Sequence, residues 1–542
     1  MKPPATRSIF KYFLTSAMLL LLANIIHAQE PVPVPSDTVN SIKIVSNTRN
    51  LTMKRVDDST NLTIVAGNVK ALQGNTIFYC DSAVDNSRTR IFEAWGNVRI
   101  VDGDTATISA RHLIYHRDKK VAYFDGNVKL TDGKGSLTTP DLEYDMYTNI
   151  GIYKNGGRVV NQKTVLTSQE GYYYADLKDV YFKKDVFLKD PAYTITTDSL
   201  LYNTQSGDAR IIAQTYIVDS SGRKIRTKEG FYNQRTGQAQ FGRRSEIIDG
   251  KTRITGDVIE LTDSIYRVTG NAIISDTAQG TTILGGLVFQ DKRTEAVLAT
   301  RKPVMIVKQD KDSIYIAADT LFTAKLTALY GARDSLTMDT LKGTKVAKLN
   351  DKDSTNRYFE AFHNVRIFND SIQATCDSMF YSFQDSTFRL YQDPVVWANN
   401  SQITGDTIYL HTKNRKADRV EAFERSFMVN KMDHEAYNQI KSTRMDGYFV
   451  NGNIDSVRAK GYAECIYYIR DDADSSYTGI NQSKCDIIDI YFQEQALHKI
   501  AFRSQVTGTI WPIRQKSPAE MRLPNFRWLE ERRPKTKYEL FE

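Results

Sequence analysis

A block of about thirty residues recurs along this chain, and the repeat limits the folds that the chain can adopt. One half of the block reads IFEAWGNVRI at 91–100, VAYFDGNVKL at 121–130 and YFEAFHNVRI at 358–367. A second half, such as ISARHLIYH from Ile108 and ITTDSLLYN from Ile195, alternates with it. Repeats of this length are typical of solenoids, in which each unit buries its apolar face against its neighbours. The sequence therefore predicts one continuous core that follows the repeats.

The second half of the block has a regular spacing. Its matching positions lie 29 or 30 residues apart and are Asp81, Arg111, Pro140, Gln169, Asp198, Lys228 and Asp257. Stacked acids can bind calcium or serve as an acid pair in a sugar-cleaving solenoid. Because Arg, Pro, Gln and Lys interrupt this column, no run of neighbouring acids builds up. Hydrogen bonding at turns and strand edges is the expected role of its aspartates.

The first half of the block alternates between apolar and polar residues, which is the pattern of a half-buried β-strand. In the first copy the other parity carries Glu93, Asn97 and Arg99, and in the second it carries Asp125 and Lys129. One face of each strand is therefore expected to line an apolar interior. The twelve candidates for this lining are Phe92, Ala94, Val98, Ile100, Ala122, Phe124, Val128, Leu130, Phe359, Ala361, Val365 and Ile367. A filled core is the other reading of the same residues.

Composition favours an all-β fold of short antiparallel strands. The chain has 30 Tyr and 24 Phe, which suit half-buried pleated surfaces, and turn-forming pairs such as Asp102-Gly103 and Asp249-Gly250 punctuate the blocks. Gly67, Gly96 and Gly126 lie inside predicted strands without a following helix, so a bulge is expected there rather than a phosphate-binding loop.

The N-terminus has the pattern of a secretory signal peptide. Lys2, Arg7 and Lys11 precede the apolar run 17–26, and His27-Ala28-Gln29 offers a cleavage point. No later stretch is long and apolar enough for a membrane-spanning helix, so a soluble exported protein is expected. The predicted divisions are a signal peptide at 1–28, a Pro-rich linker at 29–41, a repeat region at 42–330, a polar insertion at 331–356, a second repeat region at 357–513 and a charged tail at 514–542.

Two details of this organisation can be stated from local patterns. Within the tail, Ser517 to Glu520 resembles a capping box that opens a short helix, which Pro524 would end. Of the four cysteines, Cys465 and Cys485 are either a disulfide pair or buried free thiols.

No catalytic, metal or cofactor site is expected. His112 and His116 are four residues apart, which on a strand separates them by ~13 Å, so they cannot hold one metal ion together. The formal net charge of +8 comes from 72 basic residues scattered among 64 acidic ones. Solvated faces explain such a distribution, and nucleic acid is not an expected partner of an exported chain.

The GNV strands, alternating with the second half-block in an exported chain, resemble the OstA-like/LptA family of periplasmic lipopolysaccharide-transport proteins. The resemblance covers residues 42–410 and is weaker to 513. It implies an elongated antiparallel β-jellyroll or V-shaped β-solenoid built from repeats of about 29–30 residues. It also implies a non-enzymatic lipid-binding bridge that shields the acyl chains of lipopolysaccharide, or of a related lipid, on the way to the outer membrane.

The same resemblance implies partners and a location. Other β-jellyroll components of the route are expected to bind through end strands, because open strand edges pair readily with further strands. Self-association through these edges is a further expectation. The expected location is the periplasm, with association with the outer membrane left open. An extracellular carbohydrate-active β-solenoid and a non-catalytic structural solenoid are the alternative functions.

Overall fold

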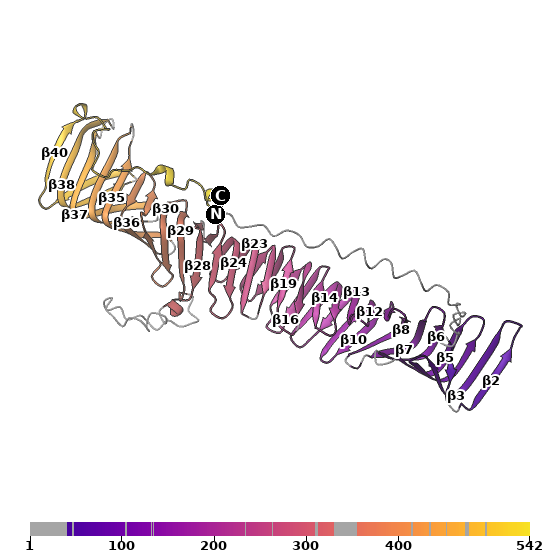
Figure 1. Ribbon diagram of the computed structural model, residues 1–542. Helices are drawn as coiled ribbons and strands as arrows, with labels where there is room; N and C mark the ends of the chain where they lie inside the picture. The colour runs from indigo at the N-terminus through magenta and orange to yellow at the C-terminus, as the bar shows by residue number, and fades with distance from the viewer. Residues whose placement is uncertain are drawn as a thin grey trace, which may run out of the picture. The chain divides into compact units, whose positions relative to one another are not determined.

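The computed structural model describes most of the chain from residue 41 onward. The described residues are 41–45, 48–102, 106–131, 133, 135–233, 235–262, 264–308, 313–329, 355–413, 416–432, 435–450, 453–471, 476–493 and 496–542. The predicted signal peptide and most of the predicted linker and polar insertion lie outside them. Antiparallel β-strands dominate the described residues, so the predicted all-β class is confirmed (Figure 1).

The chain divides into two compact units, and the division runs through β8 (Gly135–Asp145). The strands of the first unit are β1 (Lys43–Ile44), β2 (Asn50–Arg55), β3 (Asn61–Gln73), β4 (Thr76–Asn86), β5 (Ile91–Asp102), β6 (Ala106–His116) and β7 (Val121–Thr131). From β3 to β7, each strand pairs antiparallel with the next in chain order.

The second unit begins with shorter strands. They are β9 (Ile150–Tyr153), β10 (Gly157–Asn161), β11 (Thr164–Ser168), β12 (Glu170–Tyr174), β13 (Asp179–Lys189), β14 (Tyr193–Asn203), β15 (Asp208–Ile211), β16 (Thr215–Asp219), β17 (Lys224–Thr227), β18 (Glu229–Asn233), β19 (Ala239–Gly242), β20 (Ser245–Asp249), β21 (Thr252–Gly256), β22 (Val258–Leu261), β23 (Ile265–Asp276), β24 (Thr281–Asp291), β25 (Val297–Thr300), β26 (Val304–Lys308), β27 (Ser313–Ala317) and β28 (Thr320–Ala324).

Twelve further strands follow among the described residues of the same unit. They are β29 (Tyr358–Phe368), β30 (Ile372–Ser382), β31 (Thr387–Tyr391), β32 (Val395–Ala398), β33 (Ser401–Thr404), β34 (Thr407–Lys413), β35 (Lys416–Lys431), β36 (Tyr437–Val450), β37 (Asn453–Arg470), β38 (Tyr477–Gln493), β39 (Ala496–Arg503) and β40 (Thr507–Pro512). Because several of them span 14 to 18 residues, the expectation of short strands is wrong for this region.

Most repeats bend where two consecutive residues have positive φ. The described residues include twelve such pairs, at 67–68, 96–97, 126–127, 184–185, 243–244, 270–271, 301–302, 363–364, 392–393, 424–425, 461–462 and 504–505. At each pair, a strand either shifts its pairing register or gives way to the next strand. The bend divides each of these repeats into two arms, and an inner side lies between them.

The glycine bend of β5 shows why the repeat needs its residue types. Gly96 has a φ of +73°, and a Cβ added there would lie 2.4 Å from Oδ2 of Asp81 on β4. The positive φ is unfavourable for a residue with a side chain, and the close approach to Asp81 adds a steric clash at this position. The predicted strand bulge is thus present. Asp81 also has its predicted role of hydrogen bonding at a turn, because it accepts a 2.9 Å hydrogen bond from Nδ2 of Asn97.

The C-terminal tail (residues 514–542) does not form the predicted helix. Residues 518–520 are a turn, and the 3₁₀ helices nearby are η2 (Ile513–Gln515), η3 (Glu530–Arg532) and η4 (Lys537–Phe541). Met521 and Leu523 are buried on an apolar surface formed by β35, β37 and β38, which holds the chain extended. Tertiary contacts have therefore overridden the local capping pattern.

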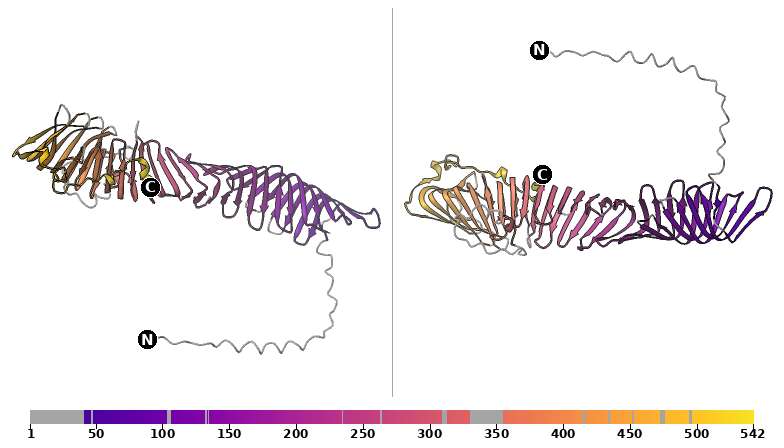
Figure 2. Two further views of the ribbon diagram at one scale, coloured as in Figure 1. Left: turned by 90° about the horizontal axis from the view of Figure 1, so that it is seen from above. Right: turned by 60° about the horizontal axis from the view of Figure 1, so that its bottom comes forward.

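The C-terminal tail covers the outer face of one arm in the second unit. Met521 and Leu523 pack with Phe427 and Val429, and Leu540 packs with Val304 and two further residues of β27 and β29. Figure 2 shows the tail, in yellow, running back along these strands. Because both faces are covered, alternation disappears and all four residues of β32, VVWA, are buried.

Candidate functional site

The apolar interior of each unit is the principal candidate site, because it contains the residues that alternation placed there. All twelve predicted lining residues are at most 6% exposed. Eight of them lie on β5 and β7 in the first unit, and the four from Phe359 to Ile367 lie on β29 in the second. Their contact with lipid stays a prediction.

The interior of the first unit is filled by its own side chains. Phe78 lies 5.7 Å from Phe92 and 5.4 Å from Tyr115, measured between ring centroids. The hydroxyl of Tyr115 donates a 2.6 Å hydrogen bond to Oε1 of Gln73, so its one polar atom is satisfied. A guest chain would therefore need these side chains to move apart, or would have to enter where the packing is incomplete.

Packing is incomplete at the N-terminal edge strand. Leu51 and Met53 of β2 pair with Val65 and Thr63 of β3, so they face the interior side of the sheet. They are nevertheless 50% and 75% exposed. The apolar interior of the first unit thus meets solvent at this edge. Sequence reasoning missed these residues, although the alternation in LTMKR from Leu51 was a usable signal.

The last strand of the second unit has the same property. Ile510 of β40 pairs with Asn481 of β38, on the same face as the buried Ser483 and Cys485, and is 65% exposed. Among the described pairings, β40 has only β38 as a partner. An unpaired edge and an exposed apolar side chain therefore coincide there.

A hollow of about 220 Å³ lies in the second unit, between the arms of β21 to β28. Its apolar lining includes Ile274, Ile283, Val297 and Met305. An apolar cavity of roughly 150 Å³ is enough to bind benzene, so this hollow can take a short hydrocarbon segment.

Polar groups surround the same hollow on one side. Arg357 Nη2 lies 2.7 Å from the Glu295 carboxylate, and Asp276 is a second acid in the lining. Oε1 of Gln290 is buried in the lining without a hydrogen-bond partner. A pocket that combines apolar and polar lining residues suits an amphiphilic molecule.

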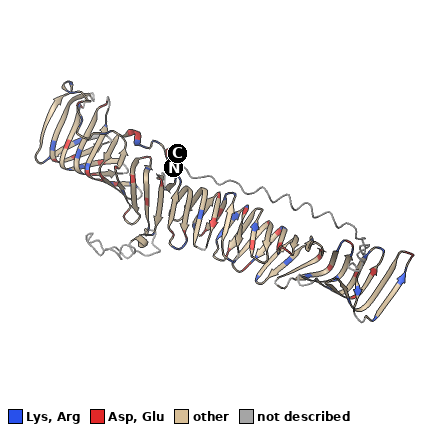
Figure 3. Cartoon of the chain, viewed as in Figure 1, with Lys and Arg blue, Asp and Glu red and all other residues tan. Residues whose placement is uncertain are grey.

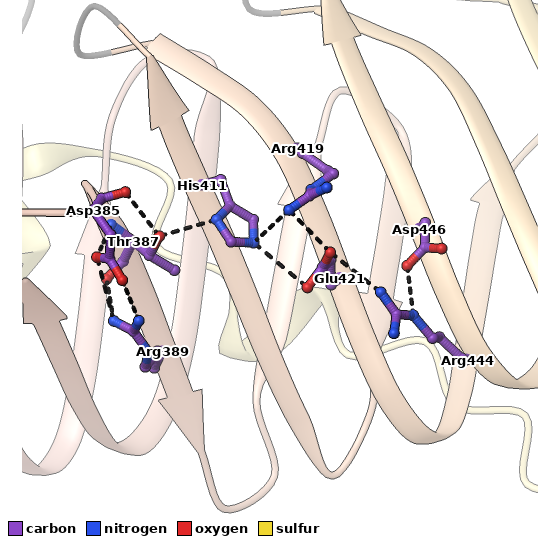
Figure 4. Close-up of polar contacts among 8 residues, drawn as sticks. All are labelled: Asp385, Thr387, Arg389, His411, Arg419, Glu421, Arg444 and Asp446. Atoms are coloured by element: carbon purple, nitrogen blue, oxygen red, sulfur yellow. Dashed lines mark hydrogen bonds and ion pairs between the residues drawn. The ribbon is translucent and has the colours of Figure 1, made fainter. Parts of the chain in front are cut away.

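The outward faces carry charge of both signs (Figure 3). A connected row crosses β31 to β36, in which His411 Nδ1 lies 2.9 Å from the Thr387 hydroxyl and Glu421 lies 3.1 and 3.2 Å from Arg419 and Arg444 (Figure 4). The Glu421 side chain is only 11% exposed, so its two guanidinium partners compensate the loss of water.

Two further carboxylates in this region are buried under basic side chains. Burial alone raises the pKa of Asp446, but hydrogen bonds from Arg444 (2.8 Å) and Lys460 (2.9 Å) outweigh it and hold the pKa below its ordinary value. The hydrogen bond from Arg458 is the main cause that lowers the pKa of Asp489, with Arg503 adding to it. These ionised pairs join neighbouring strands and indicate a structural role.

The histidines do not come together. His112 lies between Glu93 (3.0 Å) and Asp125 (2.8 Å), while the His116 ring packs edge-on against Tyr123. Burial lowers the pKa of His112, but its hydrogen bonds to the Asp125 and Glu93 carboxylates raise it above its ordinary value. Among the described residues, no group of three or more His, Cys, Asp or Glu could hold a metal ion.

All four cysteines are buried free thiols, so the disulfide alternative for Cys465 and Cys485 is wrong. Strand register explains this, because it pairs Cys465 with Ser483 and Cys485 with Ala463. Burial raises the pKa of the Cys465 thiol to about 12.

Within the described part of the chain, no helix is long and apolar enough to cross a membrane.

The bent antiparallel repeats and apolar interior define a β-repeat protein. Residues 41–198 match the sequence model of the OstA-like protein family, so the resemblance carried by the GNV strands is confirmed for that segment. No curated protein matches the chain in sequence.

Among solved structures, the chain resembles LptH, the LptA-homologous periplasmic component of the lipopolysaccharide transport device of Pseudomonas aeruginosa. The two are 17% identical, the alignment covers 26% of this chain and 95% of LptH, and the TM-score is 0.21. A likeness of this degree carries no argument about fold or function.

Proposed function

We propose that this protein is an exported, periplasmic lipid-binding bridge, which shields the acyl chains of lipopolysaccharide or a related lipid during transport to the outer membrane. The observation that carries the proposal is the inward-facing apolar row, repeated from strand to strand in an OstA-like segment. Each methylene group kept from water is worth ~0.8 kcal/mol. An apolar interior can therefore keep acyl chains out of the aqueous compartment.

Entry of the lipid is assigned to the places where packing is incomplete. In the first unit these are the exposed inward side chains Leu51 and Met53, and in the second the hollow beside Gln290 and Arg357. An acyl segment in the hollow would contact Ile274 and Met305, while the polar end of the lipid would face Gln290 and Arg357. Elsewhere, the guest chain would replace contacts between side chains such as Phe78 and Phe92.

Partner proteins are proposed to bind at the edge strands β2 and β40. Each exposes backbone groups on one edge, and each presents an apolar inward residue that is at least half exposed. Adding a strand from another β-protein would pair the backbone and continue the apolar lining. The same geometry allows self-association.

Site-specific photo-crosslinking tests the proposal. A photoreactive residue at Val98 or Phe124, both at most 2% exposed, is expected to give a lipopolysaccharide adduct in cells. The matched controls are Arg99 and Lys129, which neighbour the inward residues Val98 and Val128 and are exposed. Equal labelling at inward and outward positions would contradict the proposal, as would the absence of an adduct at both inward positions.

A further inference from the structure

Tyr462 is an aromatic residue at a bend position where the other bends have non-aromatic residues. It is the second residue of the bend in β37, with a φ of +46°, and it is 88% exposed. Its counterparts at the eleven other bends of the described residues are Asn68, Asn97, Asn127, Asp185, Arg244, Asn271, Lys302, Asn364, Asp393, Arg425 and Gln505.

The tyrosine at this bend is not explained by stability. A left-handed backbone conformation suits Asn and Asp and is unfavourable for a bulky side chain. Burial does not compensate, because most of the ring is in water. A residue that is strained and exposed at once is a reason to look for a function at its position.

A large open hollow lies beside Tyr462. It has a volume of about 970 Å³, at the upper end of the ~300–1,000 Å³ range of small-molecule sites. The bends at 392–393, 424–425 and 461–462 line it on one side, and Pro524, Asn525 and Arg527 of the C-terminal tail line it on the other. Tyr462 is therefore the aromatic surface of a concave site.

The tail side of the hollow is held in place. Gln402, which is 1% exposed, donates from Nε2 to the carbonyl of Arg527 at 2.9 Å and accepts from the N–H of Leu529 at 2.8 Å. Asp393 accepts from Arg532 at 2.6 Å and forms a longer ion pair with Arg527 at 3.4 Å. Both sides of the hollow are thus pre-formed, which lowers the entropic cost of binding.

The charges around the hollow balance each other. It is lined by three acids, Asp393, Asp406 and Glu424, and by three bases, Arg425, Lys441 and Arg527. A strongly charged ligand of either sign would meet repulsion as well as attraction, and an apolar ligand would remove water from these charged groups without replacing its hydrogen bonds. A ligand with many hydroxyl groups can both donate to the carboxylates and accept from the cations.

We propose that this hollow is an oligosaccharide-binding site in which a sugar ring stacks on Tyr462. The carbon face of a pyranose is apolar and its hydroxyl edge is polar, which matches an exposed aromatic ring beside mixed charges. Glu424 and the paired Asp406 and Arg425, whose Nε to Oδ1 distance is 2.8 Å, face the hydroxyl edge. The site is separate from the apolar interior, so it does not depend on the proposed lipid function.

Saturation-transfer NMR on the full exported chain tests this site. The probes are maltohexaose, chitohexaose and lipid-free core oligosaccharide released from lipopolysaccharide. Wild-type protein is expected to transfer saturation to at least one probe. Tyr462→Asn is expected to raise the dissociation constant of that probe roughly five- to tenfold. Tyr448→Asn, which changes another exposed tyrosine that does not line the hollow, should leave binding unchanged.

The choice of asparagine separates binding from folding. Because Asn is the commonest residue at this bend position, Tyr462→Asn should keep or raise the melting temperature. Weaker binding with an unchanged or raised melting temperature supports the site. Absence of transfer to all three probes, or wild-type affinity in Tyr462→Asn, overturns it, as does a lowered melting temperature, which would assign the tyrosine a structural role.

Discussion

Nδ2 of Asn97 donates a 2.9 Å hydrogen bond to Oδ2 of Asp81, across the bend where β4 and β5 turn together. The same contact recurs from Asn271 to Asp257 at 2.8 Å. In both cases the glycine before the asparagine leaves room for the aspartate, since a Cβ there would overlap it. Asp81 and Asp257 therefore help to fix where their repeats bend and so which side chains face inward.

Substituting Gly96 with alanine tests the bend. The new Cβ would meet Asp81 in a backbone conformation with positive φ, so Gly96→Ala is expected to lower the free energy of unfolding by about 1–3 kcal/mol. Gly133→Ala is the control, because φ is also positive there but no atom lies within 4 Å of the added Cβ. Urea denaturation should show a clearly smaller loss for Gly133→Ala. Equal losses would mean that the contact with Asp81 has no part in the bend.

Gln439 is expected to hold the C-terminal tail. It is 0% exposed, donates to the carbonyl of Met521 at 2.9 Å and accepts from the N–H of Leu523 at 2.8 Å. Gln439→Ala leaves both backbone groups buried and unpaired, at a cost of about 1–3 kcal/mol for each. Faster amide exchange across residues 518–529 should follow. Gln482→Ala, at an exposed glutamine, is the control, and unchanged exchange in Gln439→Ala would contradict the assigned role.

Local patterns predicted the interior better than they predicted the tail. Alternation identified Val98 and Phe124 as inward residues because only one face of their strands is covered. It does not apply to Val395–Ala398, where the tail covers the second face and all four residues are buried. The pairing of Gln402 and Gln439 with the tail joins positions 82 to 127 residues apart, so no short sequence window contains it.

The same limit explains the other differences. Ser517 and Glu520 satisfy a capping pattern and their side chains do lie 3.2 Å apart, but the apolar residues that follow are bound to β-strands rather than to a helix. The sequence did contain a signal for Tyr462, because this tyrosine follows Gly461 where the earlier GNV strands have asparagine. Its exposure and its position beside the hollow needed the structure.

Acid should weaken the strand pairing around Asp446. The folded-state pKa of this carboxyl is lowered, so its stabilising effect is fully present above the unfolded-state value of about 3.9 and is lost as the pH falls through the folded-state pKa. The melting temperature of wild type should therefore fall towards that of Asp446→Asn as the pH falls below about 4. A gap between the two proteins that stays constant over this range would show that the ion pairs with Arg444 and Lys460 contribute no pH-dependent stability.

Polar substitutions in the interior should distinguish an apolar row that contacts lipid from one that forms a filled core. Val128 is 0% exposed, so Val128→Asp buries a carboxylate without a partner and is expected to cost several kcal/mol of stability or to displace the strand. Lys129→Asp introduces the same carboxylate at the adjacent outward position and should be well tolerated.

The milder Val128→Thr keeps the shape and adds a single hydroxyl, which keeps the protein folded for a lipid-binding measurement. If the interior holds acyl chains, Val128→Thr should reduce lipopolysaccharide retention during purification, while Lys129→Asp should not. Normal retention by a folded Val128→Thr protein would leave Val128 as part of a filled core.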